Sequence, residues 1–230
     1  MIIKQAFILA AGRGERMKPL TDYLPKPLVK IAGISMLDRV IQKVSALAKI
    51  EKIVVNAYYL SEMIETHLKA LNDSKIILSK ETEKLETGGG LLKAMQFFNP
   101  NEPILLINSD VVWQDENNEV LDKIINAFDI NEDSILLGLK PKHEFLGYYA
   151  RGDFNFQNGK LNKPEIYDSL SHVFVGIQII HPKILQNCPK PPFSMNHFYK
   201  NLENVKGVEL SGKFFHVGDI PSITLTEQYF

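Results

Sequence analysis

The sequence contains little cysteine, little excess charge and no long apolar run. Its single cysteine, Cys188, excludes an intrachain disulfide and a zinc site built from several cysteines. The formal net charge is −1, so no strong overall field would recruit nucleic acid or an anionic membrane. No segment reaches the ~18 continuous apolar residues that a transmembrane helix needs. We therefore expect a cytoplasmic protein that binds neither nucleic acid nor membrane.

Length and composition suit one large globular domain. The 230 residues are 45% hydrophobic and 23% charged. Over the first ~140 residues, apolar strand-like runs alternate with segments of helical periodicity. We expect strands at 5–10, 52–56, 75–79, 103–108 and 134–139, and helices at 36–47, 61–71, 90–98 and 120–128. This alternation predicts a mainly parallel sheet with helices on both faces, which is a Rossmann-like three-layer α/β/α sandwich.

The alternation stops after Lys140. The remaining elements expected are a hairpin at 147–161 with its turn at Asn158-Gly159, a strand at 172–180, a short helix at 193–204, and a strand and a last helix within 213–230. We predict a single domain, residues 1–230, in which residues 141–230 form a small lobe on the same sheet as residues 1–140.

The first predicted strand runs into a turn that contains Gly12 and Gly14. Glycine lets a backbone take positive φ and bring its N–H groups close to a ligand. Met17 stands where a dinucleotide-binding fingerprint needs its third glycine, and the turn lacks the Gly-Lys-Ser/Thr of a Walker A loop. Arg16 and Lys26 add positive charge, and two prolines should steer the Lys26 backbone away from helix. An ordinary tight turn is the alternative, but the added charges favour a polyphosphate-binding loop.

Several motifs are spread along almost the whole chain. They are Leu9-Ala10-Ala11-Gly12-Arg13-Gly14-Glu15-Arg16-Met17, Pro19-Leu20-Thr21, Pro25-Lys26-Pro27-Leu28, Leu85-Glu86-Thr87-Gly88-Gly89-Gly90 and Asn108-Ser109-Asp110, with fainter ones at Phe174-Val175-Gly176 and Phe215-His216-Val217-Gly218. Together they resemble those of the sugar-1-phosphate nucleotidylyltransferases, also called nucleotide-sugar pyrophosphorylases. The resemblance implies a reaction in which a sugar 1-phosphate attacks the α-phosphorus of a nucleoside triphosphate and pyrophosphate leaves.

The same resemblance assigns the glycine loop and its cations to the triphosphate. The backbone of Ala11, Gly12 and Gly14 would cradle it. Arg16 would face the leaving pyrophosphate, and Lys26 would lie between the α-phosphate and the incoming sugar phosphate. Because no protein nucleophile is needed, catalysis would depend on positioning and charge neutralisation.

Gly88 and Gly89 lie just before the helix expected at 90–98. Without side chains, they would let a nucleobase lie against backbone whose N–H and C=O groups read its edge. Thr87 and Glu81 are nearby polar candidates. A flexible strand-to-helix turn with no ligand is the alternative.

Asp110 ends the most apolar predicted strand, where a buried carboxylate is unfavourable unless it is paired or bound to metal. The resemblance implies Mg²⁺ at this aspartate, and capping of the next turn is the alternative. Where many relatives carry a second aspartate, this chain has His216, and Asp219 follows three residues later. Asp219 could reach the metal, His216 could contact phosphate, or Asp110 could hold the metal alone. Asp219 could instead cap the last helix.

Signals for the sugar end are weaker. Asn108 lies beside Asp110 and could bond a sugar hydroxyl, as could the backbone at Gly176. Lys163 precedes a proline, as does the lysine with which some relatives hold the sugar phosphate. A Lys-Pro pair after a turn is also common by chance, so an ordinary surface role for Lys163 stays open.

The resemblance also suggests substrates. The short single-domain form and the Glu-Thr-Gly-Gly run favour uridylyl transfer from UTP to N-acetylmuramate 1-phosphate, a step of peptidoglycan recycling. Residues 1–140 would bind the nucleotide and residues 141–230 the sugar. Guanylyl transfer to mannose 1-phosphate is the alternative, and a non-catalytic nucleotide-sugar binding protein is a hypothesis of another class. Only small-molecule partners are expected, for a monomer or small homo-oligomer.

Overall fold

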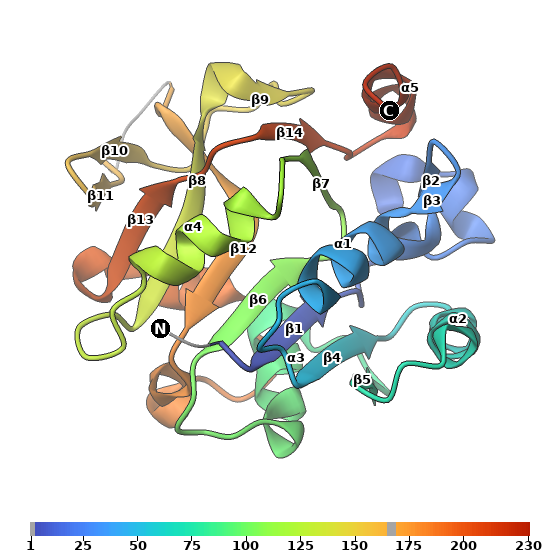
Figure 1. Cartoon of the computed structure of the whole chain (residues 1–230), viewed down its shortest axis with the longest axis horizontal. Coiled ribbons are helices and arrows are strands. Elements are labelled where there is room, and N and C mark those ends of the chain that lie inside the picture. Colours follow the sequence, from blue (N-terminus) through green and yellow to red (C-terminus); the bar gives the residue numbers. More distant parts are fainter. Residues whose placement is uncertain (1–2, 165–168) are drawn as a thin grey trace.

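A computed structural model describes residues 3–164 and 169–230. In these residues, seven strands form a central sheet in the order β13-β8-β12-β6-β1-β4-β5 (Figure 1). The bounds are β1 Gln5–Leu9, β4 Lys52–Ala57, β5 Ile76–Lys80, β6 Ile104–Asn108, β8 Ile135–Pro141, β12 His172–Ile180 and β13 Val205–Glu209. β1 lies parallel to both β4 and β6, whereas β12 runs antiparallel between β6 and β8. The expected mainly parallel sheet is thus confirmed.

Helices cover both faces of this sheet, which gives three layers (Figure 1). Alternate strand residues face opposite sides: Ile8 packs with α1, α2 and α4, whereas Phe7 packs with α3. The helices are α1 Met36–Ser45, α2 Ser61–Leu71, α3 Glu86–Ala94, α4 Glu119–Ala127 and α5 Ile220–Glu227. Ser35 caps α1 by accepting the Asp38 amide at 2.9 Å. No helix within the described ranges is long and apolar enough to cross a membrane.

A smaller, three-stranded sheet combines strands from both halves of the chain. Its strands are β7 Val111–Gln114, β14 Lys213–His216 and β9 Phe145–Leu146, and β14 lies between the other two. β7 begins directly after Asp110, and His216 pairs with Val111. Two hairpins are formed by β2 Lys30–Ile31 with β3 Ile34–Ser35, and by β10 Asn155–Gln157 with β11 Lys160–Asn162. His216 is therefore placed close to the end of β6.

Several elements differ from the expected ones. β7 and β13 were not expected, and the hairpin occupies 155–162, although its turn is at Asn158-Gly159 as predicted. The segment 193–204 contains the 3₁₀ turns η7 Met195–Lys200 and η8 Leu202–Asn204, not an α-helix. α3 begins at Glu86 and includes the three glycines, because partners from a distant segment satisfy its N-terminus.

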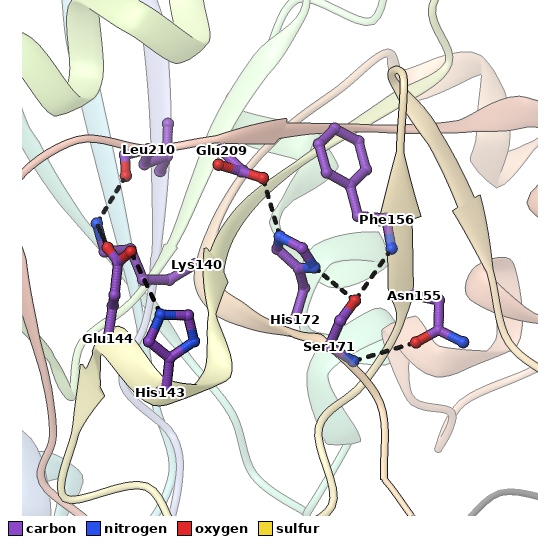
Figure 2. A network of polar contacts seen from close by, with 9 residues as sticks. All are labelled: Lys140, His143, Glu144, Asn155, Phe156, Ser171, His172, Glu209 and Leu210. Atoms are coloured by element: carbon purple, nitrogen blue, oxygen red, sulfur yellow. Dashed lines mark hydrogen bonds and ion pairs between the residues drawn. The ribbon is translucent and has the colours of Figure 1, made fainter.

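His172 on β12 joins its own strand to the edge strand β13 (Figure 2). Its Nε2 lies 2.9 Å from Glu209 on β13, and its Nδ1 lies 2.7 Å from the Ser171 hydroxyl. The buried Lys140 ammonium contacts Glu144 at 2.8 Å in the same region. Lys140 on β8 also donates to the Leu210 carbonyl directly after β13, and the Phe156 amide of the β10–β11 hairpin donates to the Ser171 hydroxyl. Side chains therefore join β8, β12, β13 and this hairpin in addition to the backbone pairing.

A bulge in β12 brings the backbone close to the end of β6. The pairing of β12 with β8 shifts between Phe174 and Gln178, and Gly176 between them has φ 83°. A Cβ on Gly176 would lie 2.5 Å from Val111 Cγ2 and 2.9 Å from Asn108 Nδ2. Gly176 is therefore required both by its backbone conformation and by the contact with Asn108.

Replacing this glycine should destabilise the protein. We expect Gly176→Ala to lower the free energy of unfolding by about 3 kcal/mol, because the methyl group combines a left-handed backbone with overpacking. Gly33→Ala is the matched control: its φ is also 83°, but no described atom lies within 4 Å of its Cβ position. Urea denaturation should show a clearly smaller loss for Gly33→Ala. Equal losses would contradict the packing argument.

Candidate active site

A cavity of about 220 Å³ lies at the carboxyl ends of β1, β4 and β6. Open parallel sheets bind ligands at this edge. Its lining residues are Leu9, Ala11, Gly12, Lys26, Pro27, Asn56, Glu81, Lys84, Glu86, Thr87, Asn108, Ser109 and Asp110. Of the predicted site residues, Ala11, Gly12, Lys26, Thr87, Asn108 and Asp110 are therefore brought together. Gly14, Arg16, Gly88, Gly89, Lys163, Gly176 and Asp219 lie outside this lining.

The two glycines of the first loop have different environments. Gly12 is exposed, and no described atom lies within 4 Å of where its Cβ would be, so its backbone is open to a ligand. Gly14 has φ 71°, and a Cβ there would lie 2.8 Å from the Lys26 Cβ. The Thr21 hydroxyl donates to the Gly14 carbonyl at 2.8 Å. Gly14 thus serves to pack Lys26, whereas Gly12 faces the cavity.

Lys26 and Asp110 form an ion pair at the cavity wall. The Lys26 ammonium donates to Asp110 Oδ2 at 2.5 Å, and 11% and 38% of the two side chains are exposed. Burial alone would raise the pKa of Asp110, but the charge and hydrogen bond of Lys26 and the charge of His216 lower it below its usual value. Asp110 is therefore an ionised carboxylate with one oxygen held by a lysine.

The backbone at Lys26 differs from the expectation. Lys26 opens a one-turn 3₁₀ helix, η3 Lys26–Leu28, although flanking prolines were expected to steer it away from helix. Proline is tolerated in the first turn of a helix, where its missing N–H would have no partner. The expectation was wrong because Pro25 lies before that turn and Pro27 within it.

Arg16 and His216 both lie beside Gly218, outside the cavity lining. A Cβ on Gly218 would lie 2.7 Å from His216 Nε2 and 3.1 Å from Arg16 Nη2. Burial and then the charge of Arg16 lower the pKa of His216, and the charge of Asp110 opposes them only partly. His216 is therefore held toward its neutral form.

Asp219 caps the last helix. Its Oδ1 accepts the Ser222 amide at 3.0 Å, and the Asp219 amide donates to the Ser222 hydroxyl at 3.1 Å. The backbone and then the side-chain hydrogen bond of Ser222 lower the pKa of Asp219. The alternative of a helix cap is thus realised, and the cap amide is accepted by Oδ1 of the Asp219 carboxylate.

The glycines of α3 are engaged by another part of the chain. The Gly88 and Gly89 amides donate to the Phe193 carbonyl at 2.9 and 3.0 Å, and the Thr87 hydroxyl accepts the Met195 amide at 2.8 Å. A Cβ on Gly88 would lie 2.4 Å from the Phe193 ring. Both amides therefore already have a partner within the protein, and the assignment of Gly88 and Gly89 to the nucleobase stays a prediction. Because these glycines have no side chains, residues 193–195 can pack directly against α3.

Sequence reasoning missed Asn56 and Lys84 as cavity residues, and it named Glu86 only as part of a motif. Asn56 is the penultimate residue of β4 and is 1% exposed, and the backbone of Glu86 has φ 61° in the cavity wall. Burial raises the pKa of the neighbouring Glu81, although hydrogen bonds from Asn56 and Leu85 partly offset it. Asn56 could have been found by the strand-end position that identified Asp110. Glu86 could have been found from its place in the Leu85–Gly90 motif, and Lys84 directly precedes that motif.

The predicted sugar-end residues are not all together. Asn108 lines the cavity and touches the Gly176 position. Lys163 lies instead at a separate hollow of about 520 Å³, with Asp153, Asn196 and Tyr199, and its ammonium lies 5.6 Å from the Phe154 ring centre. The structure therefore places Lys163 away from the Lys26–Asp110 pair.

A metal would have few protein ligands here. No group of three or more His, Cys, Asp or Glu side chains that could hold a metal occurs in residues 3–164 and 169–230. Magnesium is often bound by one or two carboxylates together with substrate phosphates, so it does not require such a group. The ionised Asp110 at the cavity fits that mode of binding.

Comparisons with known proteins agree on one family. A family model described as nucleotidyl transferase matches residues 5–162. The N-acetylmuramate alpha-1-phosphate uridylyltransferase of Caulobacter vibrioides is 34% identical over 225 residues, which cover 94% of this chain and 92% of that protein. A mannose-1-phosphate guanylyltransferase catalytic subunit beta from Danio rerio is 28% identical over 83% of this chain, but over only 53% of its own length.

Solved structures support the fold. The crystal structure of HddC from Yersinia pseudotuberculosis complexed with GMP-PN superposes with a TM-score of 0.80. It covers 99% of this chain and 100% of its own, at 21% sequence identity. The expected three-layer architecture is thus confirmed by a solved structure with the same fold.

Proposed function

Because this chain belongs to the nucleotidyl transferase family, we propose that it transfers a uridylyl group from UTP to N-acetylmuramate 1-phosphate. The products are the nucleotide-sugar and pyrophosphate, and the step belongs to peptidoglycan recycling. The observation that carries the proposal is the Lys26–Asp110 pair, held at 2.5 Å beside the open backbone of Gly12. The likeness to the Caulobacter enzyme along 92% of its length supports the choice of substrates.

The reaction forms one bond and breaks one. An oxygen of the sugar phosphate attacks the α-phosphorus, and the bond from that phosphorus to the bridging oxygen breaks, so that pyrophosphate leaves. Gly12 offers backbone to the triphosphate, Arg16 faces the leaving group, and Lys26 neutralises charge where the two substrates meet. Such preorganised charges accelerate phosphoryl-type transfer because they need no reorganisation during the reaction.

Magnesium is part of the proposal. Asp110 would be one ligand, and Asp219 the second through Oδ2, the oxygen that does not accept the cap amide. The bound ion would neutralise phosphate charge. His216 is a less suitable ligand, since an imidazole suits magnesium poorly and the pKa of His216 is lowered by burial and by Arg16.

A substrate panel tests the reaction. Purified protein is offered each of UTP, GTP, CTP, ATP and dTTP with N-acetylmuramate, N-acetylglucosamine, glucose and mannose 1-phosphates, and pyrophosphate release is measured. We expect the highest kcat/KM with UTP and N-acetylmuramate 1-phosphate. Release only with GTP and mannose 1-phosphate would replace the substrates proposed. No release with any pair would refute the enzyme and favour a nucleotide-sugar binding protein.

Removing the cavity lysine should reduce turnover more than stability. Losing one preorganised charge typically costs about 3 kcal/mol of transition-state stabilisation, so we expect kcat of Lys26→Ala to fall roughly 100-fold. Lys18→Ala is the control, because Lys18 is on the surface near the same loop and pairs with Glu15 and Asp22. Steady-state kinetics beside thermal denaturation would decide. If Lys26→Ala lowered the melting temperature but left the kcat of the folded protein unchanged, the proposed role of Lys26 would be contradicted.

The metal assignment predicts two different losses. Asp110→Asn should remove most magnesium-dependent rate, and Asp219→Asn should raise the magnesium concentration needed for half-maximal rate while preserving the cap of α5, since asparagine caps helices as well as aspartate does. Magnesium titrations of both variants, with Asp22→Asn as a surface control, measure this. An Asp219→Asn titration that overlays the wild type would leave Asp110 as the one carboxylate ligand.

A further inference from the structure

A buried chain of hydrogen bonds joins the ends of three strands beside the cavity. The Ala10 amide, directly after β1, donates to Asn56 Oδ1 at 2.7 Å. Asn56 Nδ2 donates to Glu81 Oε1, also at 2.7 Å, and Glu81 follows β5. The Leu85 backbone completes the chain by bonding the Glu81 carboxylate. Asn56 and Glu81 are 1% and 4% exposed.

Both ends of this hydrogen-bond chain reach the cavity. Ala10 directly precedes Ala11 and Gly12, which line it, and Glu81 lines it from the far side. Asn56 connects the two ends and is itself part of the lining. The backbone that would hold the triphosphate is thus fixed relative to a carboxylate by one amide side chain.

Atoms are tightly packed around this hydrogen-bond chain. A Cβ on Gly90 of α3 would lie 2.7 Å from Glu81 Oε1 and 2.8 Å from Asn56 Nδ2. Asparagine supplies one acceptor and two donors on a short side chain. An aspartate would set two carboxylates against each other, and leucine would leave the Ala10 amide and the Glu81 carboxylate without their shared partner.

We propose that Asn56 is a positioning residue that sets the Ala10–Gly12 backbone for the triphosphate by coupling it to Glu81. The inference rests on the proposed nucleotidyl transfer. Asn56 acts through its two hydrogen-bonded neighbours and not on the reacting atoms. The consequence is specific: loss of the coupling raises KM for UTP and lowers kcat, whereas KM for the sugar phosphate changes little.

An exchange of the two side chains tests this coupling. Asn56→Asp places a carboxylate against Glu81, and Glu81→Gln sets an amide N–H₂ against one of the two donors that Glu81 accepts. In the double variant, the glutamine amide at position 81 can donate to the aspartate carboxylate at position 56. That carboxylate can still accept the Ala10 amide, and the glutamine oxygen can accept from Leu85. Every hydrogen bond is kept, while the negative charge moves from position 81 to position 56.

We expect each single variant to lose about tenfold or more in kcat/KM for UTP, the size of one disrupted buried hydrogen bond. The double variant should return to within about threefold of wild type, as fully re-paired networks do. Gln5→Leu is the control, because Gln5 is equally buried at the opposite end of β1 and makes three side-chain hydrogen bonds there. It should lower the melting temperature and leave kcat/KM unchanged.

UTP binding by calorimetry, run beside turnover, separates this inference from the proposed function. Recovery of UTP affinity in the double variant supports the coupling even if wild type transfers no nucleotide. A double variant that regains its melting temperature but neither UTP affinity nor kcat/KM would overturn the inference, since the charge of Glu81 itself would then be what the nucleotide requires. Single variants that lose only thermal stability would overturn it as well.

Discussion

The arrangement of the cleft depends on the ion pair between Lys26 and Asp110. The two residues are 84 positions apart, and each is placed by a different device. Asp110 is fixed by the buried strand β6, which it closely follows, whereas Lys26 is fixed by a turn that needs Gly14 beneath it. The pair holds the Lys26 ammonium at the cavity and neutralises its charge there. In the proposed reaction, an arriving phosphate would compete with Asp110 for that ammonium.

Much of the site could be predicted because parallel strands end at a common edge. Gly12, Asn108 and Asp110 were each recognised at a predicted strand end, and they do line one cavity. The same rule applies to Asn56, which could have been selected in the same way. What strand ends do not reveal is which polar groups bond to one another. The hydrogen bonds from Ala10 to Asn56 and from Asn56 to Glu81 could therefore be identified only from the structure.

The remaining differences between the expected and the observed elements come from contacts with residues far away in the sequence. Gly88 and Gly89 have poor intrinsic helix propensity, yet they lie inside α3 because the Phe193 carbonyl accepts both amides. β13 contains Gly207 and two charged residues, so its local pattern is weak, but Gly207 is needed where a Cβ would lie 2.6 Å from Leu139. Outside the cavity lining, the sequence identified both His216 and Asp219 but could not show that Asp219 already caps a helix.

The position of β12 has a consequence for synthesis of the protein. β6 and β8 both belong to the first 141 residues, but in the sheet they are neighbours only through β12, which ends at Ile180. Until the ribosome has delivered that strand, β6, whose five residues include four fully apolar ones, keeps an open hydrogen-bonding edge. The nascent chain thus remains exposed to edge-to-edge association until about three quarters of it has been translated. Protection at that stage has to come from the cell and not from the fold.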